Sequence, residues 1–337
     1  MAGIDGIKLG GIEIEHAVHP DIKKYHKSFA TPVKEMRQRR NQNTFACATC
    51  FKLEGPAVKL RNCARCNHVQ YCSKECQKKD WALHKTGCSP SASNSPSILK
   101  IAQIIFASTF LDMHLQNCVV MAFDLVHRPV GLEKPIVARL DIATEPTELM
   151  RFFDIYLGRP VENVQGMVQL NAFTPLPDFV CDKGPMGAWQ KMRDDLVSAG
   201  PAAAGLVASV ALLIVSKANA LVCIAPLMIT HEAVGLVRRA PKVSCASAIT
   251  GTVHEEEYTV HTALEMMNKH IRADDGDRLS LRMPMAPSDI QTIRDARTAS
   301  TARPADWPAA PPRNLAASLL KEKMGRDKMY TPTIQYA

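Results

Sequence analysis

Seven of the eleven cysteines in this chain lie between residues 47 and 88, and one histidine among them completes a set of eight possible metal ligands. The ligands occur in pairs with two or three residues between the members: Cys47 and Cys50, Cys63 and Cys66, Cys72 and Cys76, His84 and Cys88. Thiolates at such spacing can share one small tetrahedral cation, with Zn–S bonds of about 2.3 Å. Eight ligands fill two tetrahedral sites, so the segment predicts two zinc ions per chain.

A disulfide framework is the main alternative explanation for clustered cysteines, and it requires an oxidising compartment. The first twenty residues carry Asp5, Glu13 and Glu15, which interrupt the apolar run that a secretory signal needs. Seven clustered cysteines also cannot all pair with one another, whereas seven cysteines and His84 fill two sites. We therefore favour zinc over disulfides or a redox centre, and we expect an intracellular protein, nuclear or cytoplasmic, that is not secreted.

The cysteine-rich segment is too short to fold around an apolar core alone. Domains of roughly 40 residues or fewer usually need metal or cross-links. Structural zinc contributes about 10–16 kcal/mol in zinc-finger peptides, so we expect zinc binding and folding of this segment to be one event. Every ligand position holds Cys or His. Such closed sites stabilise structure and leave no open position for a catalytic water.

These residues resemble a MYND-type zinc finger, and the resemblance covers residues 47–88 with every ligand present. It also includes the runs Tyr71–Gln77 and Asp80–Lys85. The resemblance implies two interleaved sites, one formed by Cys47, Cys50, Cys72 and Cys76, and the other by Cys63, Cys66, His84 and Cys88. Spacing alone would also permit sequential pairing of the ligands.

Fingers of this family mostly bind proteins, and they take up short proline-containing peptides along an exposed strand beside a Trp and a Gln. The resemblance therefore implies a peptide site made of Val69, Gln70, Tyr71, Gln77 and Trp81. Extended peptides can add to a free strand edge through main-chain hydrogen bonds. Trp81 could instead form the small core of the finger, since a domain of this size needs a large apolar residue in any case.

The basic residues are concentrated near the finger. Residues 1–97 hold 16 Lys and Arg against 8 Asp and Glu, whereas the rest of the chain holds 25 of each. Such a surplus can attract an acidic partner or nucleic acid. However, single-zinc fingers that read DNA use a Cys₂His₂ pattern with a helix that contacts bases. Because this ligand set differs, we do not expect sequence-specific DNA binding.

Composition divides the chain into five segments, and 46% hydrophobic residues in 337 are enough for a second, larger core. The predicted fold is a small zinc-stabilised finger plus a larger α+β domain of unknown topology. The segments are 1–43, polar and partly helical or disordered; 44–88, the finger; 89–97, a Ser/Pro linker; 98–295, the α+β domain; and 296–337, a disordered Ala/Pro-rich tail. The tail contains one candidate partner-binding helix, from an N-cap at Asn314 to a stop at Gly325.

Within residues 98–295, periodicity predicts several elements. They are a helix at 98–123 with a break, a half-buried strand at 136–142, a second strand at 164–170, a helix at 257–271 and a strand at 279–283. The most apolar stretch, 202–229, is interrupted by Lys217, Asn219 and Pro226. A membrane span needs about 20 uninterrupted apolar residues. We therefore expect two buried core elements there and no membrane partner.

The main alternative in function comes from analogy, since some MYND fingers lie inside SET-domain lysine methyltransferases. Those enzymes carry a glycine-rich cofactor strand before the finger and an Asn-His-Ser-Cys-type motif after it, and this sequence has neither. It also lacks a phosphate loop, a nucleophile elbow and a His-Glu-x2-His motif. We therefore predict an adaptor or regulator without catalytic residues. The alternatives are a methyltransferase-like enzyme and a nucleic-acid-binding regulator.

Overall fold

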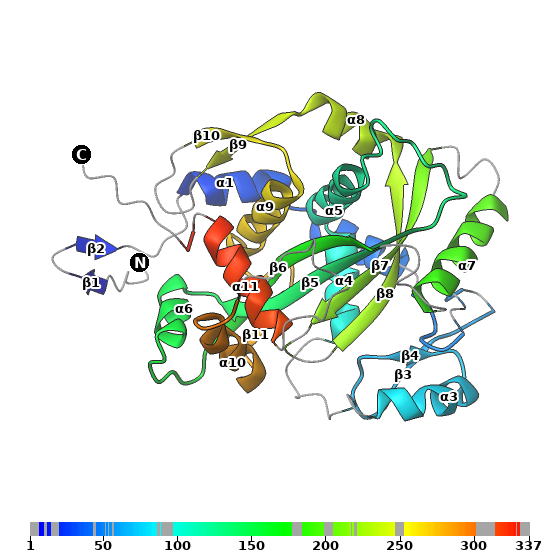
Figure 1. Ribbon diagram of the computed structural model, residues 1–337, viewed down its shortest axis with the longest axis horizontal. Coiled ribbons are helices and arrows are strands. Elements are labelled where there is room, and N and C mark those ends of the chain that lie inside the picture. Colours follow the sequence, from blue (N-terminus) through cyan, green and yellow to red (C-terminus); the bar gives the residue numbers. More distant parts are fainter. Residues whose placement is uncertain are drawn as a thin grey trace.

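A mixed five-stranded sheet lies at the centre of the larger domain, in the strand order β11-β6-β5-β7-β8 (Figure 1). Its strands are β5 (Ile136–Pro146), β6 (Gln165–Leu176), β7 (Leu206–Ser216), β8 (Leu221–Thr230) and β11 (Arg282–Pro284). β5 and β7 run parallel, and the other neighbouring pairs are antiparallel. The computed structural model describes residues 20–42, 45–85, 88, 97–176, 184–198, 205–246, 253–300 and 314–330, apart from 51, 53, 56, 217, 219–220 and 328, together with two short strands near the N-terminus.

The apolar stretch at 202–229 forms β7 and β8, which pair along their length. Alternate residues of both strands are buried in the main core, so the prediction of two buried elements is confirmed. Among the described residues, no single helix is long and apolar enough to cross a membrane. One bent pair of helices, at residues 98–107 and 109–122, meets that test by length and composition.

Strand β5 is buried on both faces, which differs from the predicted half-buried strand. One set of alternate residues, including Leu140, packs into the main core, while Val137 packs against Trp189 on the opposite face. The charged residues that suggested a solvent-exposed face are buried too: Arg139 is 8% exposed and Asp141 is 4% exposed. Their side chains form an ion pair. Because the two charges offset each other, the strand can lie between two layers.

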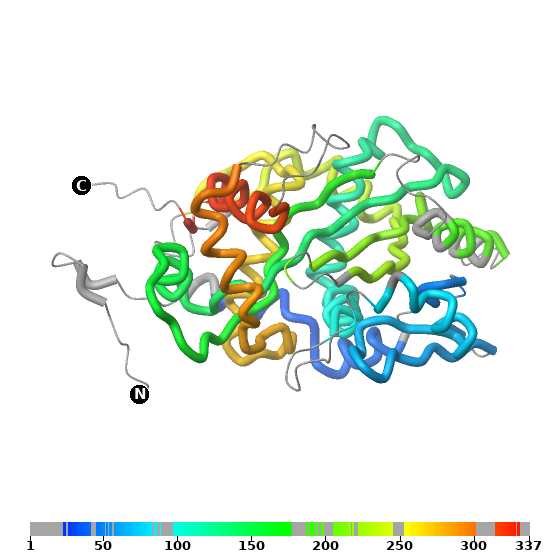
Figure 2. The backbone as a smooth tube through the Cα atoms, turned by 60° about the horizontal axis from the view of Figure 1, so that its bottom comes forward, coloured from blue at the N-terminus to red at the C-terminus, as the bar shows by residue number. Residues whose placement is uncertain are grey.

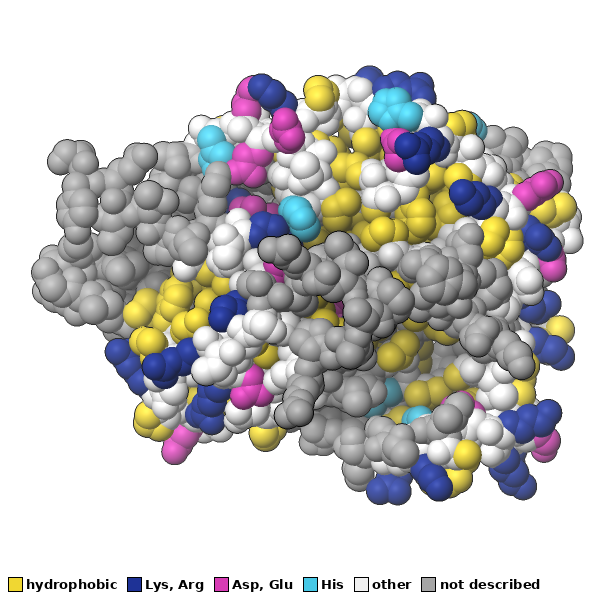
Figure 3. All heavy atoms as spheres, in the orientation of Figure 1, with side chains coloured by type: hydrophobic (Ala, Val, Ile, Leu, Met, Phe, Trp, Pro, Cys, Tyr) yellow, Lys and Arg dark blue, Asp and Glu magenta, His cyan; other side chains and the backbone are white. Residues whose placement is uncertain are grey.

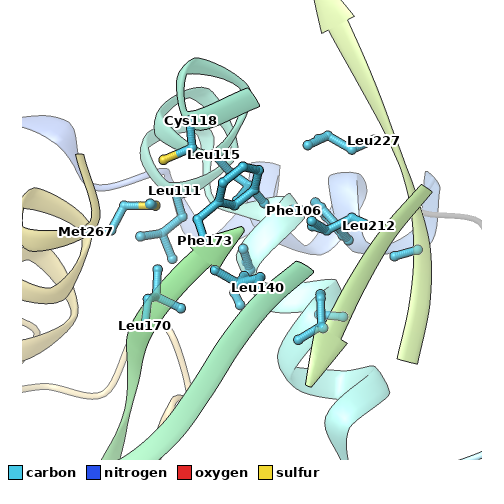
Figure 4. Packing of buried hydrophobic residues seen from close by; sticks show 14 of the residues in the cluster. Phe106, Leu111, Leu115, Cys118, Leu140, Leu170, Phe173, Leu212, Leu227 and Met267 are labelled. Atoms are coloured by element: carbon cyan, nitrogen blue, oxygen red, sulfur yellow. The ribbon is translucent and has the colours of Figure 1, made fainter. Parts of the chain in front are cut away.

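Three helices cover one face of the sheet and supply the main core: α4 (Ile98–Ala107), α5 (Thr109–Ala122) and α9 (Val260–Arg272). Figure 4 shows Phe106, Leu111 and Leu115 of α4 and α5 directed toward Leu140, Leu212 and Phe173 of the strands. The helix predicted at 98–123 is broken at Ser108, and the two halves are bent by 93°. The Ser108 backbone is extended, and its hydroxyl accepts a hydrogen bond from the Leu111 N–H, so this residue caps the second helix.

The other side of the domain is covered at two places. Helix α7 (Gly184–Ser198) places Trp189 against the sheet, and the Trp189 indole N–H donates to the Ser209 carbonyl at 3.0 Å. A separate apolar cluster joins α6 (Leu149–Tyr156), α10 (Pro287–Ala296) and α11 (Leu315–Arg326). Further described elements are β1 (Ile7–Leu9), β2 (Ile12–Ile14), α8 (His231–Arg239), β9 (Lys242–Ala246) and β10 (Val253–Glu257).

The C-terminal segment differs from the predicted disordered tail, because α11 is packed into the domain. Asn314 caps this helix as expected, and its Oδ1 accepts from the Ala317 N–H at 3.2 Å. Leu320, Met329 and Tyr330 are buried in the cluster with α6 and α10. The amphipathic face predicted to bind a partner is therefore used within the chain. Residues 301–313 and 331–337 of the predicted tail lie outside the described residues.

The N-terminal segment contributes two helices that pack against the larger domain, α1 (Pro20–Phe29) and α2 (Val33–Gln42). Met36 of α2 is buried in the main core. Arg39 donates to the Phe106 carbonyl at 3.3 Å and pairs with Asp112 at 3.1 Å. This part of the segment predicted to be polar and partly helical is thus helical and integrated into the domain. Residues 89–96, most of the predicted Ser/Pro linker, lie outside the described residues.

A buried ion pair fastens α11 to the sheet. The Lys323 ammonium lies 2.7 Å from Oε1 of Glu145 on β5, and both side chains are 1% exposed. The Tyr330 hydroxyl donates to the other carboxylate oxygen of Glu145. Burial lowers the pKa of Lys323, and the Glu145 carboxylate opposes that shift. The pair therefore holds two charges in the interior only because each compensates the other.

Removing one partner should be costly. We expect Lys323→Met to lower the free energy of unfolding by about 3–5 kcal/mol, because it leaves a buried carboxylate uncompensated. The double variant Lys323→Met with Glu145→Gln should recover much of that loss. Arg159→Met removes an exposed partner of Asp154 and serves as the control, with an expected cost below about 1 kcal/mol. Denaturant unfolding measures the free energy of unfolding of the single, double and control variants. If that of Lys323→Met lay within about 1 kcal/mol of the unsubstituted chain, the buried ion pair would not stabilise the fold.

Candidate metal centre

The finger is built from a short hairpin followed by one helix: β3 (Arg61–Asn62), β4 (Gln70–Tyr71) and α3 (Lys74–His84). Ser73 is the N-cap of α3, and its hydroxyl accepts from the Cys76 N–H at 3.2 Å. This cap starts the helix directly after Cys72, so Cys72 and Cys76 lie one turn apart and face the same way. His84 occupies the last turn of the same helix.

The eight predicted ligands form two separate clusters in the structure. Within each cluster, the ligand atoms all lie within 4.8 Å of one another: Cys47, Cys50, Cys72 and Cys76 in the first, and Cys63, Cys66, His84 and Cys88 in the second. The interleaved arrangement is therefore confirmed, and sequential pairing is excluded.

The distances between ligand atoms fit tetrahedral zinc. In the first cluster the Sγ atom of Cys72 lies 3.5 Å from that of Cys50 and 3.6 Å from that of Cys76. In the second, Cys63 and Cys88 have their sulfurs 3.8 Å apart, and His84 Nε2 is 3.4 Å from the Cys63 sulfur. Zn–S bonds of about 2.3 Å in a tetrahedron place sulfurs roughly 3.8 Å apart. The protein thus holds each ligand set near the geometry that one Zn²⁺ requires.

Backbone hydrogen bonds bring distant ligands together in the first site. The Ala48 N–H donates to the Gln70 carbonyl at 3.0 Å, and the Thr49 hydroxyl donates to the Cys76 carbonyl at 2.8 Å. These two contacts fasten the Cys47–Cys50 loop to β4 and to the first turn of α3. Sequence analysis did not identify Ala48 or Thr49, because neither the ligand spacing nor the apolar pattern marks them.

The second site depends on a tight turn in the hairpin. Asn67, which follows Cys66, has a φ of +56°, a left-handed conformation that Asn tolerates better than most residues. Its N–H donates to the Cys63 carbonyl at 2.9 Å, and the Cys63 N–H donates to the Val69 carbonyl at 2.8 Å. The chain therefore reverses between Cys63 and Val69 and presents two thiols on one side of the turn, where they meet His84.

The protonation chemistry of the thiols also favours a divalent cation. Burial opposes ionisation of Cys47, yet backbone N–H donors, first that of Cys50, lower its pKa to about 7. In the same cluster, burial and the neighbouring sulfurs raise the pKa of Cys72 to about 12. Without a cation, this cluster therefore favours a thiolate at Cys47 and opposes one at Cys72. A dication between the four ligands removes this repulsion and stabilises them all as thiolates.

The finger is attached to the larger domain through its own apolar residues. Phe45, which precedes the first ligand, is buried in the main core, and Leu60 packs against the same core. Figure 2 shows the finger beside α4 and away from α11. Zinc therefore stabilises the contact between the finger and the domain as well as the finger itself.

The predicted peptide residues divide into two groups. Tyr71 is 2% exposed, and its hydroxyl donates to Asp80 at 2.6 Å, so its side chain belongs to the interior of the finger. Val69 packs against the same interior, and the Gln70 carbonyl already accepts from Ala48. Gln77 is half-buried, and Trp81 is 41% exposed. Of the predicted peptide site, the accessible part is therefore on α3 and not among the side chains of β4.

Two zinc ions per chain are expected on metal analysis of purified, reduced protein. Cys63→Ala should lose the second zinc and unfold the finger. The larger domain should remain folded but with a lower free energy of unfolding, since Phe45 and Leu60 would lose their support. Chelation of zinc from the unsubstituted chain should give the same loss of stability. Cys118→Ala, a buried cysteine of α5, is the control and should retain both ions. One zinc or none in the folded, unsubstituted protein would refute the two-site assignment.

Comparison with known proteins identifies the finger. A family model described as MYND finger matches residues 47–88. Human N-lysine methyltransferase SMYD2 is 45% identical over 51 residues, which are 15% of this chain and 11% of that protein. SET domain and MYND-type zinc finger protein 6 of Schizosaccharomyces pombe is 47% identical over 45 residues, 13% of this chain and 9% of that protein. The chain therefore spans about a tenth of the length of these curated relatives, and the similarity is confined to the finger.

No solved structure matches the chain. A second family model matches residues 93–330, more than half of the chain, and its span includes α11 and Tyr330, which are packed into the domain. The chain carries a MYND finger and belongs to the family described as Domain of unknown function (DUF8205).

Proposed function

We propose that this protein is an adaptor or regulator whose MYND finger binds a proline-containing peptide of a protein partner beside Gln77 and Trp81. The finger is a zinc-binding interaction module, and such fingers generally mediate protein–protein contacts. The peptide specificity and the adaptor role are the parts that we add. They rest on how the finger distributes its aromatic residues.

The observation that carries the proposal is the exposure of Trp81. The interior of the finger consists of the zinc ligands with Tyr71, Val69 and Leu60, and Trp81 is outside that cluster. The indole therefore does not serve as the small core that a finger of this size needs. Tryptophan is enriched among the residues that dominate binding energy at protein interfaces. An exposed Trp on a rigid helix is thus a candidate anchor.

Gln77 lies one helical turn before Trp81, so the amide and the indole are neighbours on the same face of α3. An amide can hydrogen-bond to the main chain of an extended peptide while the indole packs against an apolar or proline side chain. Proline suits such a site because its restricted backbone loses little conformational entropy on binding. The pair thus offers both kinds of contact that a short extended peptide needs.

The larger domain would act as a rigid platform in this function. Phe45 and Leu60 pack against its core, and α2 packs beside α4. A finger joined in this way presents α3 in one fixed orientation, which reduces the ordering cost of binding. This role needs no catalytic group from the domain.

Trp81→Ala should weaken binding of the partner peptide by at least about 2 kcal/mol, or roughly 30-fold, because it removes an aromatic anchor. Isothermal titration of the peptide into the unsubstituted chain and into Trp81→Ala, at equal zinc content, measures the two affinities. Val33→Ala, another exposed apolar residue on α2, is the control and should leave affinity unchanged. Unchanged affinity in a Trp81→Ala protein that keeps both zincs would refute the proposed docking site.

A lysine methyltransferase is the second candidate, because relatives that share the finger include N-lysine and histone-lysine methyltransferases. That similarity covers the finger alone, and the sequence lacks the SET-type motifs described above. We expect no binding of S-adenosylmethionine by the full chain in a calorimetric titration. Micromolar affinity would instead support the enzyme and make the adaptor role secondary.

A further inference from the structure

Three exposed lysines form a stripe on α3 with Trp81 among them. Lys74, Lys78, Trp81 and Lys85 are separated by four, three and four residues, so they occupy one face of the helix. Lys85 is the C-cap residue and retains helical backbone angles, which extends this face to the end of the helix. All four side chains are exposed. We call these four residues the lysine stripe.

Positive charge dominates the finger surface around the stripe. Every Lys and Arg of residues 45–88 is exposed: Lys52, Lys59, Arg61, Arg65, Lys74, Lys78, Lys79 and Lys85. Figure 3 shows Lys and Arg side chains gathered on this part of the molecule.

The acidic residues of the finger are mostly engaged in its own structure. Asp80 accepts from the Tyr71 hydroxyl, and Glu54 accepts from the Leu60 N–H at 3.5 Å. Glu75 is exposed, and its carboxylate interacts with the cap residue Ser73 and with the nearby charges of Lys78 and Lys74. Against the three lysines of the stripe, Glu75 supplies one opposing charge. The stripe therefore keeps a net positive charge that is available to a partner.

We propose that the lysine stripe binds an acidic segment of the protein partner, with carboxylates on both sides of an apolar or proline residue that packs on Trp81. This inference rests on the proposed function and specifies the chemistry of its partner. From Lys74 to Lys85 the helix rises about 16 Å, which roughly five residues of extended peptide can span. The complementary sequence therefore has its apolar residue near the centre and acidic residues toward both ends.

A protein partner fits the stripe better than nucleic acid does. DNA-binding proteins with strong salt dependence typically contact 6–10 phosphates, and the stripe provides three cations. An exposed indole between them favours a segment that alternates apolar and acidic groups. Charged groups at the edge of such an interface mainly raise the association rate and set specificity.

The test uses the full chain with zinc bound and two fluorescent peptides, each with a Pro-Leu-Pro centre. One carries three aspartates on each side of the centre, and the other carries three asparagines. Anisotropy titrations are made in 50 mM and 300 mM salt. The stripe variant is Lys74→Glu, Lys78→Glu and Lys85→Glu combined. The matched control, Lys52→Glu, Lys59→Glu and Lys79→Glu, changes the net charge equally but lies off the stripe, and zinc content is measured for both.

We expect the acidic peptide to bind about 10-fold tighter than the amide peptide in 50 mM salt, because three lysines face its carboxylates. Most of this preference should disappear in 300 mM salt, and it should be lost in the stripe variant while the control retains most of it.

Each other outcome has a defined meaning. Equal binding of both peptides, lost in Trp81→Ala, would overturn this inference and leave the proposed function standing. Acidic preference that needs the stripe but not Trp81 would refute the packing on Trp81, and with it both this inference and the proposed docking site. Failure of both peptides to bind would overturn both. If the control variant lost the acidic preference as fully as the stripe variant, the preference would reflect net charge and not the lysine stripe. If a DNA duplex displaced the labelled acidic peptide at a lower concentration than the unlabelled acidic peptide does, the partner would be nucleic acid and not protein.

Discussion

Two coordination spheres determine the path of the chain from residue 45 to residue 88. Each requires four ligand atoms within a few ångströms, and because the sites are interleaved, neither forms from a contiguous stretch. The loop at Cys47 must reach α3, and the turn at Cys63 must reach the last turn of the same helix. Coordination therefore replaces the apolar core that so short a segment cannot build. As a result, the largest aromatic residue of the finger is free to lie on its surface.

The same constraint reaches beyond the finger. Phe45 lies two residues before the first ligand, and Leu60 lies three residues before Cys63, so both are positioned by the metal sites. The Phe45 side chain is buried in the core of the larger domain, and the Leu60 side chain packs against that core. Residues that pack against the larger domain are thus only two or three positions away from residues that bind zinc. A module that binds partners is in this way held in one orientation on the domain that carries it.

The zinc ligands could be predicted from sequence because their chemistry is local: thiols at fixed spacing can bind metal whatever surrounds them. The position of the break at Ser108 and the burial of both faces of β5 could not, because they depend on which layers cover a strand or helix. The alternation around Arg139 and Asp141 is typical of a half-exposed strand, and an ion pair between layers gives the same pattern. Likewise, the cap residue Asn314 indicated the helix that carries Lys323, but the composition after residue 296 gave no sign that this helix packs into the domain. The partner of Lys323 lies 178 residues earlier, a separation at which no periodicity can be detected.

That long-range pair has a consequence for how the domain forms during synthesis. Chains emerge from the ribosome from the N-terminus onward, and domains often fold as their residues appear. Here Glu145 lies in a central strand, but the cation that compensates it lies 178 residues later, in α11. Until Lys323 and Tyr330 have left the ribosome, this part of the sheet carries an uncompensated carboxylate and cannot pack as it does in the finished protein. The nascent domain therefore cannot complete its packing on that side of the sheet until α11 has been synthesised. A chain truncated before α11 leaves Glu145 without its cation.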